Sequence, residues 1–390
     1  MSLSSFLDIR TEKKSLVYSI YYLYLCSGLA SNLLGAILPA MQVEYGMSYA
    51  LRGYVLSAHQ IGNFLAVLLA GFVPYAIGRK NSTIMMGSLT VFGLMIMTLT
   101  GNPFLLILAF AFTGMGRGTI TNITNVVVNE NTGNKSAGLN ILHASYAIGA
   151  FISPFAAVVA TKYEWRYAAW LFAAFMISAF IFTGRSNMSS KPMKKEKGGA
   201  DFFFLRSFSF WLNTTIMFFY VAVEASLTGW LVTYFNDTGL MSTSLSQSMQ
   251  SLLWIMILLG RLCCAALSSR FNKIIMLIVM AVMMMASFIL MMSSSSTILI
   301  VAGLLGLGFF MSGVYPTTLS TMDSRYNGST IATGVCISTA TVGGVLLPII
   351  IGQVAEVSGI AGGIATIFFA MVFMLAFMLL KFIRFKKGII

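Results

Sequence analysis

Long runs of apolar residues, separated by short polar segments, occupy almost the whole chain. Each run has about 20 residues or more, the length that an α-helix needs to cross the hydrocarbon layer of a bilayer. The pattern predicts twelve membrane-spanning helices with short loops and little room for a soluble domain. The predicted spans are residues 15–41, 52–74, 80–100, 103–127, 137–160, 166–184, 208–235, 243–267, 273–293, 297–320, 330–353 and 362–383.

Two pairs of similar segments recur at one fixed separation. GFVPYAIGRK begins at Gly71 and returns in degraded form as AALSSRFNK from Ala265. GAFISP begins at Gly149 and returns as GGVLLP from Gly343, so both separations are 194 residues, close to half of the 390-residue chain. Parallel internal repeats of this kind are typical of membrane transporters. We therefore expect two six-helix bundles with the substrate path between them.

The longest polar stretch lies between the sixth and seventh predicted spans. It reads GRSNMSSKPMKKEKGGADFFFLRS and contains a cluster of lysines. The sequence therefore predicts an N-terminal bundle at 1–184, a cytoplasmic linker at 185–207 and a C-terminal bundle at 208–390.

Composition and charge indicate how the chain is oriented. Hydrophobic residues make up 58% and charged residues 9%, whereas soluble domains have about 45–50% and about 25%. Most of the 24 Lys and Arg residues fall on the side of both termini, and the exceptions in loops are Arg52, Lys162 and Arg166. This bias predicts a multi-pass protein of the inner (cytoplasmic) membrane with both termini in the cytoplasm. The net charge of +13 then faces the anionic lipid bilayer, and we expect no nucleic-acid partner.

The sequence lacks the motifs that accompany catalysis. It has no phosphate-binding loop, no cluster of metal ligands and no nucleophile with a base. All four cysteines fall inside predicted spans, where they are expected to act as small packing residues. We therefore expect no enzymatic activity, no cofactor and no metal site.

The loop after the second predicted span has a frame of glycines and bases. Its matching residues are Gly71, Gly78, Arg79 and Lys80. Together with twelve spans, the basic linker and the repeat, this loop resembles the signature of the major facilitator superfamily. Tyr75 stands where that family has an acid, and the second copy of the loop keeps a base at Arg270. The resemblance covers nearly the whole chain and implies an all-α fold of two pseudo-symmetric bundles.

The resemblance also implies a gate at the cytoplasmic side. In the family, loop bases pair with acids at the inner ends of neighbouring helices and hold that side closed. Glu130 and Asp323, which lie nearly one repeat apart, are the candidate acids. Arg261, near the inner end of the eighth span, is expected to be a structural part of the second-half gate. For Arg79 and Lys80, topological anchoring is the alternative of equal weight.

Glu224 is the acid that the predicted spans place inside the membrane. A charge there costs at least ~2.5–3.5 kcal/mol, so it points to a function. Tyr220 and Thr228 lie one helical turn away on the same face. Because burial disfavours the charged form of a carboxyl group, we predict that Glu224 couples transport to protons or contacts the substrate. A structural hydrogen bond to a neighbouring helix is the alternative.

Two further residues join Glu224 as predicted proton-coupling residues. Arg117, in the glycine-rich stretch GMGRGT, can pair with a carboxylate such as Glu224 or bind substrate oxygens in a fork. A structural ion pair or a packing role is its alternative. His143, followed one turn later by Tyr146, can titrate near neutral pH, although a hydrogen-bonded neutral histidine has nearly equal weight.

Amides and aromatic rings inside the spans suit a hydroxyl-rich solute, because a hydroxyl both donates and accepts hydrogen bonds, as an amide does. For each residue, hydrogen bonding between helices is the alternative. The predicted substrate-binding residues are Asn32, Gln60, Asn63, Asn122, Asn125, Tyr146, Tyr220, Thr228, Trp230 and Tyr315.

Four segments resemble one branch of the superfamily, the fucose/proton symporters and related sugar transporters. They are NILHASYAIGAFISP, YVAVEASLTGWLVTYF, GFFMSGVYPTTLS and GVCISTATVGGVLLP. The GPxxGG motif of drug/proton antiporters is absent, since the chain has SPFAA from Ser153. Fucose symporters also have a carboxylate on the first helix, where this chain has Asn32. The proton site of those symporters therefore does not carry over.

The combined interpretation is a monomeric secondary active transporter that takes up a small polar organic solute, a sugar or sugar derivative, with H⁺ by alternating access. Na⁺ in place of H⁺ stays open. One rival is proton-coupled efflux of an amphipathic compound, which the 27 methionines and 31 phenylalanines would accommodate. A second is a sensor that binds a solute without transporting it.

Overall fold

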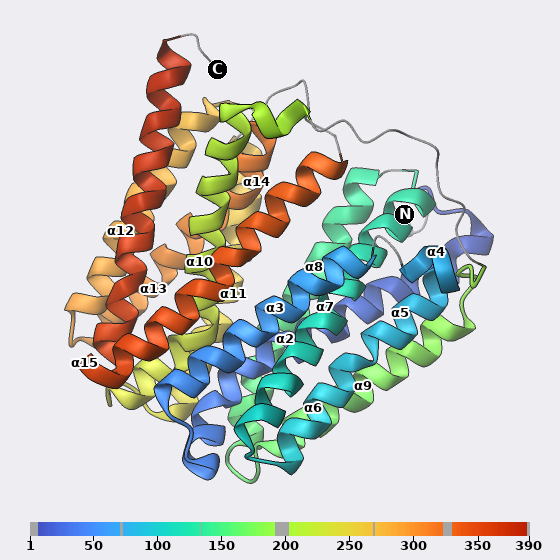
Figure 1. The fold of residues 1–390 in the computed structure, drawn as a ribbon, viewed down its shortest axis with the longest axis horizontal. Coiled ribbons are helices and arrows are strands. Elements are labelled where there is room, and N and C mark those ends of the chain that lie inside the picture. Colours follow the sequence, from blue (N-terminus) through green and yellow to red (C-terminus); the bar gives the residue numbers. More distant parts are fainter. Residues whose placement is uncertain are drawn as a thin grey trace. The chain divides into compact units, whose positions relative to one another are not determined.

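The computed structural model describes residues 7–70, 73–133, 135–191, 203–267, 270–322 and 330–387, and the regular elements in these ranges are all helices (Figure 1). The first part of the chain forms η1 (Thr11–Lys13), α2 (Lys14–Tyr45), α3 (Tyr49–Ala70), α4 (Val73–Ile77), α5 (Arg79–Gly87), α6 (Leu89–Leu99), α7 (Pro103–Asn131), α8 (Lys135–Ala160) and α9 (Arg166–Arg185). The second part forms η2 (Phe203–Arg206), α10 (Phe208–Asp237), α11 (Thr243–Leu267), α12 (Lys273–Ser293), α13 (Thr297–Met311), α14 (Val314–Ser320) and α15 (Thr330–Lys386).

The helices confirm the predicted twelve-helix membrane architecture. Within the described ranges, ten stretches are long and apolar enough to cross a membrane, and the last of them, Gly334–Lys386, covers most of one predicted span and all of another. These two spans meet at Gly359, whose φ of 72° breaks the helix. The predicted second span is α3, which is not among the ten but has 22 residues, enough for about 33 Å of helix.

Two helix starts show how the local sequence defines the spans. Asn102 precedes α7, and its side-chain oxygen accepts hydrogen bonds from the backbone N–H groups of Phe104 and Leu105. Asn272 caps α12 in the same way. Asparagine is among the best N-cap residues because its side chain satisfies N–H groups that have no partner within the helix. Pro103, at the first position of α7, loses no helical hydrogen bond there.

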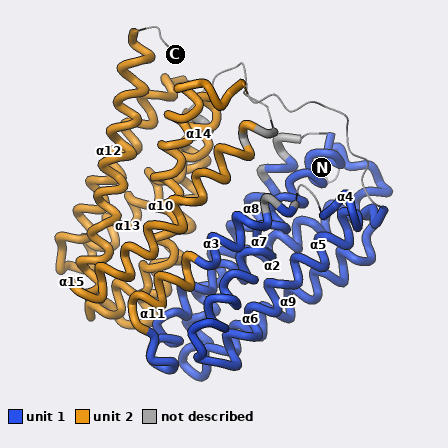
Figure 2. The backbone as a smooth tube through the Cα atoms, viewed as in Figure 1, with its two compact units in different colours: residues 1–47, 58–197 blue, residues 48–57, 198–390 orange. Residues whose placement is uncertain are grey.

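The chain forms two compact units (Figure 2). Unit 1 comprises Met1–Met47 and Ala58–Lys197, and unit 2 comprises Ser48–Ser57 and Gly198–Ile390. The predicted N-terminal bundle includes 48–57, whereas the contacts of this segment group it with unit 2. Helix α3 therefore begins in unit 2 and continues in unit 1. The predicted linker at 185–207 is divided between the two units after Lys197.

Unit 1 is built around α2, which packs chiefly against α8. Glycines allow the two backbones to approach closely. A Cβ atom at Gly28 would lie 2.3 Å from the carbonyl oxygen of Tyr146, and one at Gly149 would lie 2.2 Å from that of Leu25. Small residues at helix crossings are how membrane helices gain close packing, because lipid provides no hydrophobic drive between helices.

Unit 2 has the matching arrangement, with α10 packed chiefly against α15. A Cβ atom at Gly343 would lie 2.2 Å from the carbonyl oxygen of Phe218. Gly343 is the repeat partner of Gly149, since the two are 194 residues apart. The first and fifth spans of each predicted bundle thus cross at an equivalent glycine.

A second glycine contact repeats in the same way. In unit 1, a Cβ atom at Gly114 would lie 1.8 Å from the carbonyl oxygen of His59, and in unit 2 one at Gly308 would lie 2.9 Å from that of Leu253. Both members of the second contact follow those of the first by 194 residues. The repeat seen in the sequence is therefore also present in the packing.

Candidate functional site

Polar side chains from α2, α7 and α8 meet in unit 1. The amide nitrogen of Asn32 is 3.3 Å from the Tyr146 hydroxyl and also donates to the carbonyl of Gly28, 3.0 Å away in its own helix. The guanidinium carbon of Arg117 lies 5.7 Å from the centre of the Tyr146 ring, within the range of a cation–π contact. Three residues that the sequence proposes for coupling or binding, Asn32, Arg117 and Tyr146, therefore lie together, and Tyr146 contacts the other two.

Aromatic rings extend this cluster along α8. The Tyr24 ring is 5.1 Å from that of Tyr146 and 5.7 Å from that of His143. Sequence reasoning missed Tyr24, although a signal was present: Tyr24, Gly28 and Asn32 follow one another at intervals of four and so share one face of α2. We call Tyr24, Asn32, Arg117, His143 and Tyr146 the unit 1 cluster.

The other amides of unit 1 make local contacts. Asn122 donates to the carbonyl of Gly118 at 2.9 Å and Asn125 to that of Thr121 at 2.7 Å, both one turn back in α7. Gln60 and Asn63 are half-buried on α3. The structure thus places all four on membrane helices but does not join them to the unit 1 cluster by a hydrogen bond among the described residues.

Glu224 of α10 is the centre of a second cluster, in unit 2. The Tyr220 hydroxyl donates to Glu224 Oε1 at 3.1 Å, and Arg261 Nη2 of α11 lies 3.9 Å from the same oxygen. The Tyr315 ring is 6.0 Å from the Tyr220 ring. The side chains of Glu224 and Arg261 are 24% and 39% exposed, so this ion pair remains accessible. We call these four residues the unit 2 cluster.

The structure places Arg261 beside Glu224, and its predicted structural part in the second-half gate stays a prediction. Arg261 is six residues before the end of α11 at Leu267, and its long side chain reaches a carboxylate of the neighbouring helix α10. Arg117 is in unit 1 and Glu224 in unit 2, so a pairing of these two stays a prediction.

The remaining polar contacts near Glu224 involve the backbone of α10. Thr228 Oγ1 donates to the carbonyl of Glu224 at 2.8 Å, and the carbonyl of Thr228 accepts from Gln250 Nε2 at 3.1 Å. The hydroxyl of Thr228 therefore donates within α10, and its carbonyl accepts a hydrogen bond from α11. Within the described ranges, no group of three His, Cys, Asp or Glu side chains is placed to hold a metal ion.

Trp230, a predicted substrate platform, is fully buried in a contact that the sequence did not reveal. The guanidinium of Arg52, at the start of α3, lies 5.5 Å from the Trp230 ring and 4.0 Å from that of Tyr49. Both terminal nitrogens of Arg52 are 3.3 Å from Asp237 Oδ2, which also accepts from the Tyr49 hydroxyl at 3.1 Å. All four residues belong to unit 2, and here Trp230 contacts a cation of the protein itself.

The loop motif of the first half lies against two other parts of unit 1. Arg79 Nη2 donates to Glu130 Oε1 at 2.8 Å, and Arg79 Nη1 contacts the other carboxylate oxygen. Lys80 Nζ donates to the carbonyls of Gly184 at 3.0 Å and Ser186 at 2.8 Å. The bases of the motif thus connect the start of α5 with the ends of α7 and α9.

Gly78 shows why this loop needs a glycine. Its φ is 82°, a conformation that residues with a Cβ rarely adopt, and a Cβ would lie 2.4 Å from the carbonyl oxygen of Ser190. Of the other proposed gate residues, Gly71 and Asp323 lie outside the described residues, and Arg270 is exposed in the turn before α12.

Lys381 lies two residues before the end of the predicted span 362–383 and is buried in the structure. It is 2% exposed, and its Nζ donates to Asn213 Oδ1 at 2.6 Å and to Thr321 Oγ1 at 2.5 Å. A lysine near the end of a span is expected to extend to the membrane surface, so this burial could not be predicted from the sequence.

The chain matches a family model described as the Major Facilitator Superfamily over residues 20–348. No curated protein sequence matches it.

Solved structures similar to the chain are transporters. The nucleoside transporter NupG is 15% identical with a TM-score of 0.70 over 97% of this chain and 100% of the other, and a mutant of it is 13% identical with a TM-score of 0.79 over 93% and 98%. A bacterial homologue of the human lysosomal transporter Spinster, inward-facing and occupied, is 12% identical with a TM-score of 0.77 over 95% and 97%. At these identities the likeness shows the fold.

Proposed function

We propose, on the premise that this chain belongs to the major facilitator superfamily, that it is a proton-coupled symporter of a small polar organic solute. The family makes it a multi-pass membrane transporter of a small molecule, and not an enzyme. The proposal adds the coupling ion, the direction of uptake and alternating access. Its supporting observation is the partly accessible Glu224 carboxylate beside Arg261 and Tyr220.

A proton on Glu224 would change the unit 2 cluster in a defined way. The ionised carboxylate attracts the Arg261 guanidinium across 3.9 Å and accepts from the Tyr220 hydroxyl. The protonated carboxyl loses the charge attraction and gains an O–H donor. Loading and release of one proton would thus switch both the charge of the site and the pattern of donors that it offers to a solute.

The proposed solute class, a sugar or sugar derivative, rests on the donors and acceptors of the unit 1 cluster. Asn32 and Tyr146 supply an amide and a phenol that can both donate and accept, as each hydroxyl of a sugar does. The rings of Tyr24 and Tyr146 add flat surfaces. Because one structural neighbour is a nucleoside transporter and a nucleoside is a sugar derivative, nucleosides join free sugars as candidates.

The proposal also includes the membrane location, the oligomeric state and the cytoplasmic gate of the transporter. The excess of positive charge on one side of the predicted spans supports the cytoplasmic membrane as the location and cytoplasmic termini. We propose that the protein works as a monomer, with its loop bases Arg79 and Lys80 and the acid Glu130 contributing to the cytoplasmic gate, since these residues bind one another or neighbouring helix ends.

Proteoliposome assays with labelled sugars and nucleosides test the proposal. An inward proton gradient should drive uphill accumulation of at least one of them. Glu224→Gln should abolish that accumulation but retain counterflow, which needs no net proton movement. Glu356→Gln is the matched control, because its amide oxygen can still accept from the backbone N–H of Ala50 as Glu356 Oε1 does. A Glu224→Gln variant that accumulates solute as well as the wild type would refute the coupling role.

A further inference from the structure

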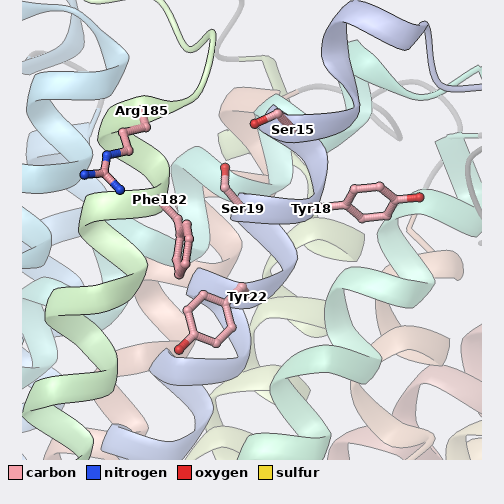
Figure 3. A pocket seen from close by; sticks show the side chains of 6 residues that line it. All are labelled: Ser15, Tyr18, Ser19, Tyr22, Phe182 and Arg185. Atoms are coloured by element: carbon pink, nitrogen blue, oxygen red, sulfur yellow. The ribbon is translucent and has the colours of Figure 1, made fainter.

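A pocket of about 370 Å³ lies in unit 1 between the start of α2 and the end of α9 (Figure 3). Side chains of α2 line one side of it, and two side chains of α9 line the other. The lining residues are Ser15, Tyr18, Ser19, Tyr22, Phe182 and Arg185. No role in the proposed transport cycle involves these residues.

The mouth of this pocket is positively charged. Arg185 is exposed in the last turn of α9 and forms no ion pair with the residues that the structure describes. Ser15 is exposed on α2, and its hydroxyl points toward the α9 side, whereas the Tyr18 ring points away from Arg185 (Figure 3). A guanidinium fork with a hydroxyl donor across the pocket is an arrangement that suits a phosphate group.

The floor of the pocket is aromatic and fixed in place. The Tyr22 and Phe182 rings meet edge to face, 5.7 Å apart, and the Tyr22 hydroxyl is already bonded to Ser178 Oγ at 2.9 Å. Phe182 is 54% exposed and its neighbour Ile181 is 49% exposed. On a membrane-spanning helix, such exposed apolar side chains face acyl chains. The pocket therefore leads from a cationic mouth to a lipid-facing surface.

We propose that this pocket binds an anionic phospholipid by its phosphate group. Arg185 pairs with the phosphate, the Ser15 hydroxyl donates to it, and an acyl chain lies along Phe182. Basic pockets between membrane helices recognise lipid head groups in this way. A soluble anion would use the charged mouth alone, whereas the aromatic floor and the exposed apolar face provide a surface for a chain.

The test is retention of phosphatidylglycerol, compared with phosphatidylcholine, by the full-length purified protein in native mass spectrometry. Arg185→Gln should reduce phosphatidylglycerol retention about fivefold and leave the weaker phosphatidylcholine signal unchanged. Arg185→Lys keeps the charge without the fork, so its retention should fall between those of the wild type and Arg185→Gln. Arg206→Gln, which removes an exposed arginine outside the pocket, should have no effect.

Two outcomes would overturn the proposal. One is an Arg185→Gln protein that retains phosphatidylglycerol as the wild type does. The other is full thermal protection of the detergent-solubilised protein by inorganic phosphate alone, equal to that given by phosphatidylglycerol, because it would identify a site for a free anion. Protection by phosphatidylglycerol that is lost in Arg185→Gln, with no effect of phosphate, supports the lipid site.

Discussion

Two arginine–carboxylate pairs of this protein differ chiefly in their surroundings. In unit 2 the side chains of Arg52 and Asp237 are 0% and 12% exposed, whereas in unit 1 those of Arg79 and Glu130 are 22% and 47% exposed. Only the first pair is enclosed by aromatic rings. Water can solvate Arg79 or Glu130 if its partner is lost, but it cannot reach Arg52. The comparison teaches that burial determines how much stability is lost when one partner of a pair is removed.

The buried pair is also part of a tighter helix contact. The segment that carries Arg52 packs against α15, where a Cβ atom at Gly53 would lie 2.6 Å from the carbonyl oxygen of Pro348. Leu56, one turn further along α3, lies over Gly229 of α10. The start of α3 is thus held by an ion pair and by close backbone packing at the same time.

The largest effect is expected when the buried pair loses its cation. Arg52→Gln leaves the Asp237 carboxylate without its counter-charge in a largely buried site, and the loss of one partner from a buried pair costs about 3–5 kcal/mol. We expect a clear drop in the thermal unfolding midpoint in detergent.

A second substitution sharpens this result. Arg52→Gln combined with Asp237→Asn removes both charges and should recover part of the lost stability, because no uncompensated charge remains. If Arg52→Gln alone has the same thermal unfolding midpoint as the wild type, the buried pair is not what stabilises the start of α3.

An intermediate effect is expected from adding a methyl group where the backbones of α3 and α15 touch beside the pair. Gly53→Ala places a methyl group against the Pro348 carbonyl and forces α3 and α15 apart, which costs about 1–3 kcal/mol. Gly334→Ala is the matched control, since a Cβ at Gly334 meets nothing within 4 Å. Both variants would be compared by thermal unfolding, and equal midpoints would contradict the close packing at Gly53.

The smallest effect is expected at the exposed pair. Arg79→Gln should lower stability by less than about 1 kcal/mol, because solvent-exposed ion pairs contribute little. The same unfolding assay, run with Glu130→Gln beside it, measures this. A loss as large as that of Arg52→Gln would break the comparison and show that exposure does not set the importance of these pairs.

The spans could be predicted because the length of an apolar run has one simple physical cause, the thickness of the bilayer. The repeat could be predicted because Gly149 and Gly343 stand where helix backbones touch, which no larger residue permits. The sequence could not show that 48–57 packs with unit 2, since Arg52 at the start of a span has the pattern of an ordinary loop charge.

The site could be predicted only in part. Glu224 was identifiable because an acid inside a span is costly. Its partner Arg261 could not be identified. The angle and position at which α10 and α11 cross determine which of their residues meet, and the residue spacing along one helix does not reveal this crossing. The same limit explains Trp230 and Lys381, whose partners come from distant parts of the chain.

The segment Ser48–Ser57 has a consequence for any attempt to divide the protein. A cut in the linker would give a C-terminal fragment that carries Asp237 and Trp230 but lacks Arg52, which covers both. That fragment would leave Trp230 and the Asp237 carboxylate without the cation that contacts them. Although the two halves share one pattern of spans, they are not interchangeable. Unit 2 includes ten residues, Ser48–Ser57, that come from the first half of the sequence.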